Sequence, residues 1–159
     1  MKLEKVNSKN VWELLKLEVD DSQKNFVATN TESIVEAYTT LAAGGKVFPF
    51  GIYEGGEPVG FLMIGYDSAD CDDGAPEIAK GNYSLWRLMI DKRFQGRGYG
   101  RRAIELALDF IRTFPCGRAE YCYLSYEPEN LRAKRLYESF GFAGNGEMDE
   151  DEVVAVLKL

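Results

Sequence analysis

The chain has 159 residues and contains no histidine, an absence that removes several kinds of catalytic site. Ser-His-Asp and Cys-His catalysis both need an imidazole, and so do histidine-ligated metal centres. Acid–base chemistry must therefore come from carboxylates, tyrosine, lysine, cysteine or water. We expect no metal site.

Cysteine is scarce, and long apolar runs are missing. The three cysteines, Cys71, Cys116 and Cys122, show no CxxC spacing, which favours reduced thiols over a disulfide framework. The first ten residues are polar and charged, unlike a signal peptide. No apolar stretch has the length of a membrane span. We therefore expect a cytoplasmic protein that does not associate with membranes.

Positive charge is also in deficit, with 19 Lys and Arg against 26 Asp and Glu and a net charge of -7. Non-specific binding of nucleic acids needs a basic face, so we expect no nucleic-acid partner. The acidic excess is compatible with a cationic substrate, although a charge that only keeps the protein soluble is the simpler explanation. The length fits a single domain over residues 1–159.

Alternating and helically spaced apolar residues predict an α/β fold with one mixed sheet flanked by helices. The predicted strands are 2–6, 47–53, 58–66, 83–91, 119–126 and 153–159. The predicted helices are 11–19, 31–41, 98–113 and 131–140. The residues from 67 to 81 are rich in Asp, Gly and Ala and predict a loop.

The residues from 85 to 100 combine an apolar strand, a glycine-rich turn and the start of a helix. Gly96, Gly98 and Gly100 allow the backbone to approach a ligand, and the first N–H groups of a helix have no partner inside it. Such a turn is suited to bind phosphates. It is neither a dinucleotide fingerprint nor a Walker motif, because the later glycine and the Gly-Lys-Ser/Thr are missing. For this turn alone, a purely structural role is the alternative.

A second motif makes the interpretation more specific. Gln95-x-x-Gly98-x-Gly100 is followed by Asn130-x-x-Ala133-x-x-Leu136-Tyr137-x-x-x-Gly141-Phe142. Together they resemble the GNAT superfamily of acyl-CoA N-acetyltransferases, and the element order is similar to that family's over nearly the whole chain. The resemblance implies a GNAT-type mixed central sheet. In it, a splayed pair of parallel strands, 83–91 and 119–126, would hold acetyl-CoA as co-substrate.

The resemblance also implies where acetyl-CoA binds. The backbone of Leu88, Met89 and Ile90 would pair with the pantetheine arm like an added strand, and an N–H near Met89 would stabilise the oxyanion. Asn130 would bond the arm. Lys134 would approach a phosphate, although a solvated helix lysine is an equal alternative. The pyrophosphate would be bound by the turn and the first helical residues: Gln95, Gly96, Arg97, Gly98, Tyr99, Gly100 and Arg101.

Tyr137 lies two helical turns from Asn130, on about the same face. The resemblance implies that it is the general acid that protonates the departing thiolate, whereas helical spacing alone favours a core tyrosine. The general base stays open. Many family members place a glutamate on the central strand, but here that strand carries Trp86-Arg87. Glu127, Asp20, Asp21 or an ordered water could accept the proton, and Arg87 is expected to be ion-paired.

Several short phrases, among them those at 23–28 and 124–130, resemble the bacterial spermine/spermidine (diamine) N-acetyltransferases of this superfamily. They imply a small-molecule amine substrate, most specifically a polyamine, which spaced carboxylates and aromatic faces would recognise. The candidate residues are Asp20, Asp21, Trp86 and Glu127, with Tyr38 and Tyr66 as further aromatic walls.

Other interpretations stay open at this level. The acidic run from 147 to 152 is either an attractor for cations or a solvated hairpin turn. Aminoglycosides and peptide amines are alternative acceptors, and a non-catalytic acyl-CoA-binding module is an alternative on the same scaffold. The strand 153–159 either completes the sheet or pairs across a homodimer.

Overall fold

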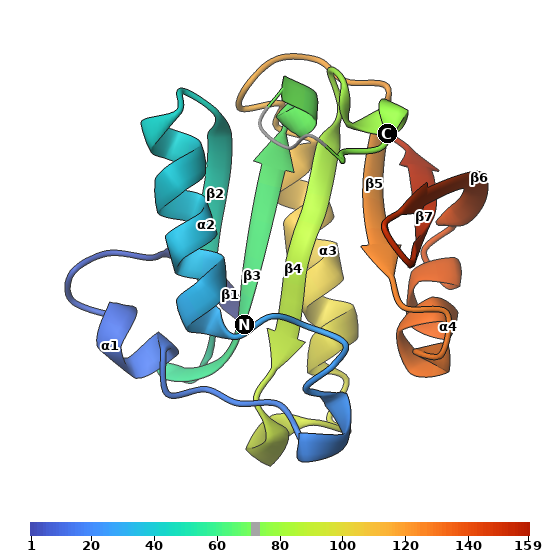
Figure 1. Cartoon of the computed structure of the whole chain (residues 1–159). Helices are drawn as coiled ribbons and strands as arrows, with labels where there is room; N and C mark the ends of the chain where they lie inside the picture. The colour runs from blue at the N-terminus through green and yellow to red at the C-terminus, as the bar shows by residue number, and fades with distance from the viewer. Residues whose placement is uncertain (71–73) are drawn as a thin grey trace.

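The computed structural model describes residues 1–70 and 74–159. Within them a mixed sheet runs in the order β1-β2-β3-β4-β5-β7-β6, with helices on both faces (Figure 1). The strands are β1 (Lys2–Lys5), β2 (Lys46–Glu54), β3 (Glu57–Tyr66), β4 (Tyr83–Ile90), β5 (Tyr121–Tyr126), β6 (Ala143–Asp149) and β7 (Glu152–Lys158). The helices are α1 (Val11–Leu14), α2 (Asn30–Ala42), α3 (Tyr99–Ile111) and α4 (Leu131–Glu138).

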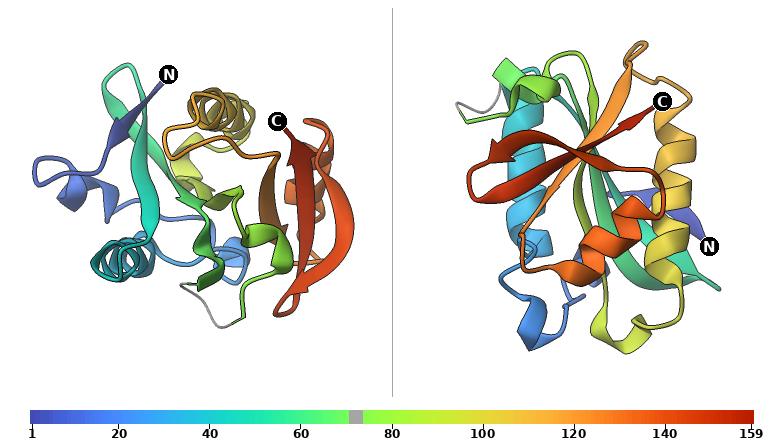
Figure 2. Two further views of the ribbon diagram at one scale, coloured as in Figure 1. Left: turned by 90° about the horizontal axis from the view of Figure 1, so that it is seen from above. Right: turned by 90° about the vertical axis from the view of Figure 1, so that its right-hand side faces the viewer.

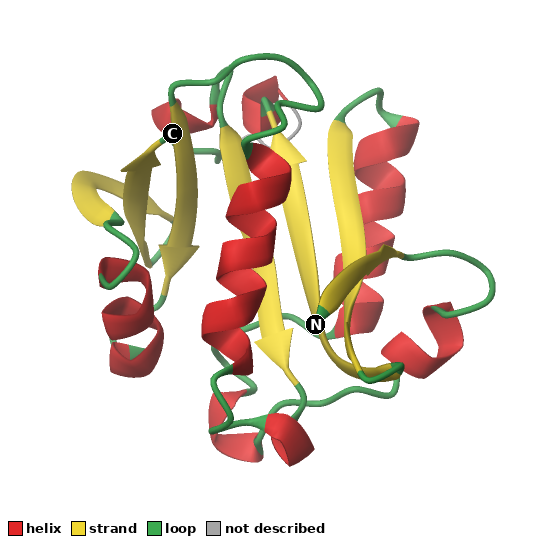
Figure 3. Ribbon diagram, turned by 180° about the vertical axis from the view of Figure 1, so that it is seen from behind, coloured by secondary structure: helices red, strands yellow, loops and turns green. Residues whose placement is uncertain are grey.

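The two long helices cover opposite faces of the sheet, as the views from above and from behind show (Figures 2 and 3). Alternation along β3 divides the core between them. Leu62 and Ile64 pack in the cluster that contains the buried side of α3. Phe61 and Met63 pack in the cluster that contains Ala37 of α2. The sheet is therefore buried on both faces here, and a site must form at its edge or where strands separate.

The first predicted helix was too long. It was expected over 11–19 but ends after Leu14, and the chain then runs on irregularly to a 3₁₀ turn at Asp21–Gln23. Leu14 and Leu17 are both buried under the sheet, and the N–H of Glu18 donates to the carboxylate of Asp91. These contacts with distant parts of the chain override the helical spacing.

The strand β6 was not predicted. Its sequence, AGNGEMD, contains two glycines, an asparagine and two acidic residues, most of which are depleted in strands. It forms an edge strand paired to β7, and an edge tolerates such residues because it carries less packing. The predicted terminal strand lies between β5 and β6 of the same chain, so it completes the sheet.

The parallel strands β4 and β5 separate, as predicted. They pair only at Tyr83 with Cys122 and at Ser84 with Tyr123. Just beyond, the register between β3 and β4 shifts, so that Trp86 is an extra residue in β4. A bulge of this kind bends the strand and increases its twist. The lower ends of β4 and β5 therefore diverge, as Figure 1 shows.

The cysteines and the apolar content of the helices can both be described from the structure. Cys116 and Cys122 are both free thiols, in line with reduced cysteines, and burial raises the pKa of Cys122 to about 12. Cys71 lies outside the described residues. No helix in the described ranges is long and apolar enough to cross a membrane.

Asp91 stabilises the end of β4, and its removal should destabilise the fold. The carboxylate is 2 % exposed and accepts hydrogen bonds from the N–H groups of Glu18 and Arg93 and from the Arg93 guanidinium. We expect Asp91→Asn to lower the free energy of unfolding by about 1.5–3 kcal/mol at pH 7, because charged hydrogen bonds are lost. Urea unfolding measures this, and Asp21→Asn at an exposed ion pair is the control.

The same variant should change the pH dependence of stability. Burial opposes ionisation of Asp91, but the hydrogen bonds from Arg93 and Glu18 outweigh it and hold the pKa below its usual value. The stabilisation is therefore complete above the unfolded pKa of about 3.9 and is lost as the pH falls through the lower folded pKa. The difference between wild type and Asp91→Asn should shrink over that range. A constant difference down to the acid transition would contradict this role.

Candidate active site

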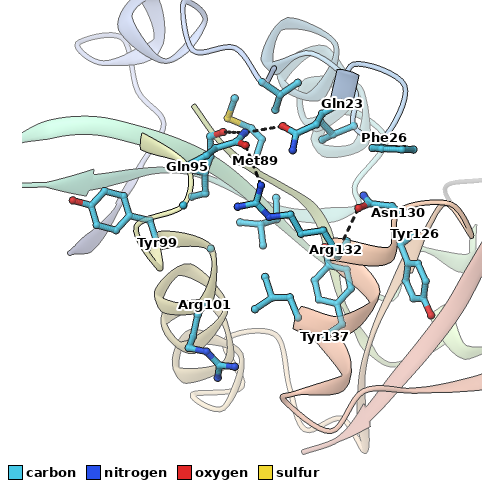
Figure 4. A pocket seen from close by; sticks show the side chains of 18 of the residues that line it. Gln23, Phe26, Met89, Gln95, Tyr99, Arg101, Tyr126, Asn130, Arg132 and Tyr137 are labelled. Carbon is cyan, nitrogen blue, oxygen red and sulfur yellow. Dashed lines mark hydrogen bonds between the residues drawn. The ribbon is translucent and has the colours of Figure 1, made fainter. Parts of the chain in front are cut away.

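A cleft of about 420 Å³ lies between the separated ends of β4 and β5 (Figure 4). One wall is the end of β4 with the glycine turn that follows it. The opposite wall is the end of β5 with the first two turns of α4. The segment before α2 contributes Val19, Gln23, Phe26 and Val27 at the mouth. We call this space the CoA cleft, for the co-substrate that the sequence predicts.

The glycine turn has the backbone that an anion site requires. Gly98 is the N-cap of α3 and has a φ of +79°, and Gly96 has a φ of +76°. A Cβ built on either residue meets no atom within 4 Å, so the space beside the turn is open. The N-terminus of the 13-residue helix α3 also favours negative charge there. The turn therefore fits the pyrophosphate of CoA.

The arginines predicted at the turn are placed differently from one another. Arg101 lines the cleft, donates to Ser139 Oγ at 2.7 Å and stacks on Phe140. Arg97 does not line the cleft. Its guanidinium lies over the ring of Phe94 and donates to a backbone carbonyl.

Gln95 connects the turn to both neighbouring walls. Its Nε2 donates to the carbonyl of Ile90 at 2.9 Å and to Gln23 Oε1 at 2.7 Å. Arg132 of α4 approaches its Oε1 at 3.5 Å, and Figure 4 shows Gln95 between Gln23 and Arg132. These contacts fix the amide of Gln95 beside the open end of β4.

The cation that α4 presents to the cleft is Arg132, whereas the sequence suggested Lys134. Lys134 is exposed and lines neither this cleft nor its neighbouring cavity. Asn130 caps α4 by accepting the N–H of Ala133 at 3.1 Å, which stabilises the start of the helix. No sequence pattern shows which of Arg132 and Lys134 faces the cleft, because both lie on the same short helix. The way α4 packs against the sheet decides which side chain points into the cleft.

The backbone groups of Leu88 and Ile90 in β4 point away from β3, and the carbonyl of Ile90 accepts a hydrogen bond from Gln95 Nε2. The N–H of Asp91, just after β4, donates to the carbonyl of Val59 on β3 at 2.9 Å. Hydrogen-bonded pairs recur every second residue in an antiparallel ladder, so Met89, opposite Phe61, also turns its N–H and C=O toward β3. The carbonyl oxygen of Met89 lies 2.4 Å from a Cβ built on Gly60 of β3, which agrees with a carbonyl that points toward β3. An oxyanion donor near Met89 would therefore be the backbone N–H of a flanking residue, Leu88 or Ile90.

Tyr137 lines the cleft from α4 and also packs in the core. Its ring centroid is 5.9 Å from that of Tyr126 and 6.1 Å from that of Phe142. Burial, together with the nearby charge of Glu152, raises the pKa of Tyr137 to about 12. The phenol is therefore protonated at neutral pH and has a proton to donate.

A second cavity of about 820 Å³ adjoins the CoA cleft on the side of β7. Leu88, Ser125 and Tyr137 are among the residues that line both spaces. Its cationic lining residues are Lys24 and Arg87. Its acidic lining residues are Glu32, Glu36, Glu127, Asp149, Glu150, Asp151 and Glu152. We call this cavity the acidic pocket.

Residues 10–142 match the sequence model of the Acetyltransferase (GNAT) family. The chain belongs to this family. It is 36% identical over 113 residues, 70% of each chain, to a spermine/spermidine N(1)-acetyltransferase of Bacillus subtilis (strain 168). It is also 42% identical to a mycothiol acetyltransferase of Beutenbergia cavernae over 67 residues. That match covers 42% of this chain and 21% of the relative's chain.

Solved structures show the same fold. The aminoglycoside acetyltransferase AAC(6')-Ib in complex with coenzyme A superimposes with a TM-score of 0.79 at 20% identity, covering 99% of this chain and 94% of that one. The PaiA N-acetyltransferase of Thermoplasma acidophilum in complex with coenzyme A gives 0.67 at 11% identity, covering 99% and 98%. The predicted GNAT fold, the acyltransferase class and acetyl-CoA as co-substrate are thus confirmed.

The GNAT chain brings together two of the four predicted substrate residues. Trp86 and Glu127 line the acidic pocket. Asp20 and Asp21 line neither space; Asp20 accepts hydrogen bonds from Ser22, and Asp21 pairs with Lys24 at 2.6 Å. The additional aromatic candidates, Tyr38 and Tyr66, also lie outside both spaces.

Arg87 is ion-paired, as expected, and its partner is Glu36. The guanidinium Nη2 contacts both carboxylate oxygens, at 3.0 and 3.1 Å, and the guanidinium lies 5.9 Å from the centroid of Trp86. The pair joins β4 to α2 across 51 residues of sequence, so no local pattern indicates it. The acidic residues from 147 to 152 have different surroundings. Residues 149–152 line the acidic pocket, whereas the carboxylate of Glu147 accepts a hydrogen bond from the N–H of Ile78.

Proposed function

We propose that the protein transfers the acetyl group of acetyl-CoA to a primary amine of a polyamine of the spermine or spermidine type. The observation that carries the proposal is the acidic pocket, which shares Leu88, Ser125 and Tyr137 with the lining of the CoA cleft. A linear polycation would place one ammonium at this junction and its others among the pocket's carboxylates. The identity to a spermine/spermidine N(1)-acetyltransferase supports the same acceptor.

The residues of the CoA cleft would bind and orient acetyl-CoA. The N–H groups of the glycine turn and of the start of α3 would bind the pyrophosphate. The backbone of Leu88 and the N–H of Ile90, on the side of β4 that faces away from β3, would hold the pantetheine amides like an added strand. A backbone N–H of the same stretch would stabilise charge on the thioester oxygen as the amine attacks. The co-substrate supplies the activated acetyl group.

Tyr137 would complete the transfer by giving its phenolic proton to the sulfur of CoA. The raised pKa of Tyr137 keeps the proton available but also makes the phenol a weak acid. Transfer to the thiolate therefore depends on its position at the junction rather than on acid strength. The packing of its ring against Tyr126 and Phe142 would hold that position.

An aminoglycoside is the second candidate acceptor, because it is also polycationic. The acidic pocket by its charge alone accommodates either class. The fold is shared with an aminoglycoside acetyltransferase at 20% identity, whereas the polyamine acetyltransferase is related at 36%. We therefore favour the polyamine.

An amine panel tests the proposal. We expect spermine and spermidine to release the CoA thiol from acetyl-CoA with a lower KM than a monoamine of similar length, because the monoamine lacks the distal charges. In the same assay Glu127→Gln should raise the KM for spermine by about two- to fivefold and leave kcat nearly unchanged. Glu129→Gln, two residues along and outside both spaces, is the matched control.

Two results would reject the polyamine acceptor. One is turnover confined to aminoglycosides or peptide amines. The other is an equal KM for spermine and the monoamine, which would mean that the distal ammonium groups are not recognised. Raised salt should weaken spermine binding in wild type and have less effect in Glu127→Gln.

A further inference from the structure

A protonated amine cannot attack a thioester, and the strand β4 carries Trp86 and Arg87 where a carboxylate would be expected. Within the described residues, a carboxylate reaches the junction of the two spaces from another strand. Glu152 is the first residue of β7, lines the acidic pocket and accepts a hydrogen bond from Ser125 Oγ. Ser125 and Tyr137 both line the CoA cleft as well.

We propose that Glu152 is the general base, which accepts the proton of the acceptor ammonium at the junction between the acidic pocket and the CoA cleft. The proposal rests on the proposed function, because it assigns a residue to that reaction. It places acid and base on separate elements, with Tyr137 on α4 and Glu152 on β7.

Two other carboxylates of the pocket are held by partners elsewhere. Glu36 is held by both contacts to Arg87. Glu32 forms the capping box of α2 with Thr29. Glu127 and Glu152 both line the acidic pocket and not the CoA cleft, but in the described part of the chain no hydrogen bond or ion pair joins the Glu127 carboxylate to Tyr137 or Ser125. Glu152 is tied to both, through the hydrogen bond to Ser125 and its charge near Tyr137.

The environment of Glu152 makes it a better proton acceptor than an ordinary glutamate. Burial raises its pKa, the hydrogen bond from Ser125 lowers it, the charges of Asp149 and Glu127 raise it and the charge of Arg87 lowers it, with a net rise. These groups, with Tyr137, face it from β4, β5, β6, α4 and the loop after β5. A carboxylate with a raised pKa binds a proton more tightly in the transition state.

The ammonium gives one proton to the Glu152 carboxylate, and the neutral nitrogen forms a bond to the carbonyl carbon of the acetyl group. The carbon–sulfur bond breaks, and the sulfur takes the proton of Tyr137. The second proton leaves the nitrogen and restores the phenol, while Glu152 releases its proton to water. The products are the acetylated amine, the CoA thiol and one proton.

The test is the pH dependence of Glu152→Gln. We expect kcat at pH 7 to fall by about 100- to 10,000-fold, with the KM for spermine changed much less. In wild type, kcat should fall at low pH as Glu152 is protonated. In the variant that acid limb should be lost, and the residual rate should keep rising with pH. Glu138→Gln, exposed and outside both spaces, should behave like wild type.

Ser125→Ala provides a second readout that does not remove the carboxylate. Loss of the hydrogen bond that lowers the pKa of Glu152 should move the acid limb to higher pH, with the alkaline plateau of kcat largely retained. A purely structural role of Glu152 would lower the rate equally at every pH. That outcome, or an unchanged acid limb in both variants, would overturn the assignment.

Failure of this assignment is distinguishable from failure of the polyamine acceptor. If wild type acetylates spermine and both variants keep the wild-type profile, only the role of Glu152 is rejected. If wild type acetylates an aminoglycoside instead, the same profiles are measured with that amine, since its ammonium must also lose a proton.

Discussion

Tyr137→Phe should lower kcat by about 100- to 10,000-fold, the range for removing a positioned general acid. The affinity for acetyl-CoA should change little, because only a hydroxyl is deleted and the ring keeps its contacts with Tyr126 and Phe142. Steady-state kinetics with spermine and calorimetric binding of CoA separate the two effects. Tyr121→Phe, on the same sheet but outside both spaces, is the matched control.

The variant also distinguishes the two roles predicted for Tyr137. If it served only as a core tyrosine, loss of the hydroxyl would leave kcat nearly intact and any effect would be seen in thermal stability. A kcat within threefold of wild type would therefore contradict the catalytic assignment. A matching loss of CoA affinity would instead indicate that the hydroxyl binds the co-substrate.

Gly98→Val should weaken CoA binding by about 10- to 100-fold, equivalent to the loss of a hydrogen bond to a charged group. The valine would project into the space beside the turn that is open in the structure, where the phosphates are proposed to lie. It would also be strained at a φ of +79°. The turn at the start of α3 would therefore lose its backbone conformation, and the space beside it for the phosphates would be filled.

Strain alone must be separated from loss of the phosphate site. Gly146→Val is the matched control, because Gly146 has a φ of +91°, is equally open and lies on β6 away from the CoA cleft. Both variants should lower the melting temperature, but only Gly98→Val should weaken CoA binding by calorimetry. Equal CoA affinity in Gly98→Val and wild type would refute the placement of the pyrophosphate.

The sequence predicted the parts of the site that depend on local backbone chemistry. The glycine turn at 96–100 and the helical spacing between Asn130 and Tyr137 depend on neighbouring residues, and the structure adds the positive φ of Gly96 and Gly98 and the cap at Asn130. Their combination was specific enough to indicate a GNAT fold and acetyl-CoA. The order of strands and helices followed from the same local patterns, apart from the shortened α1 and the missed β6.

The acceptor side was predicted less well, because it is assembled from distant segments. Asp20 and Asp21 were chosen for their place in the chain, yet they lie outside the acidic pocket. Arg132 replaces Lys134 at the cleft because the docking of α4 sets the direction of its side chains. The acidic residues 149–152, at the turn between β6 and β7, contribute to the acidic pocket because β7 lies between β5 and β6 in the sheet.

By itself, then, the sequence determined the GNAT family, the co-substrate and the turn that would hold its phosphates, since each depends on residues close together in the chain. Only the tertiary structure decided which residues line the space between β4 and β5 and the acidic pocket beside it. The bulge at Trp86 separates β4 from β5 and opens the cleft. Long-range strand pairing then brings Glu152 and its partner Ser125, 27 residues apart, to the junction with Tyr137. No local pattern encodes that meeting, because it depends on which strands pair.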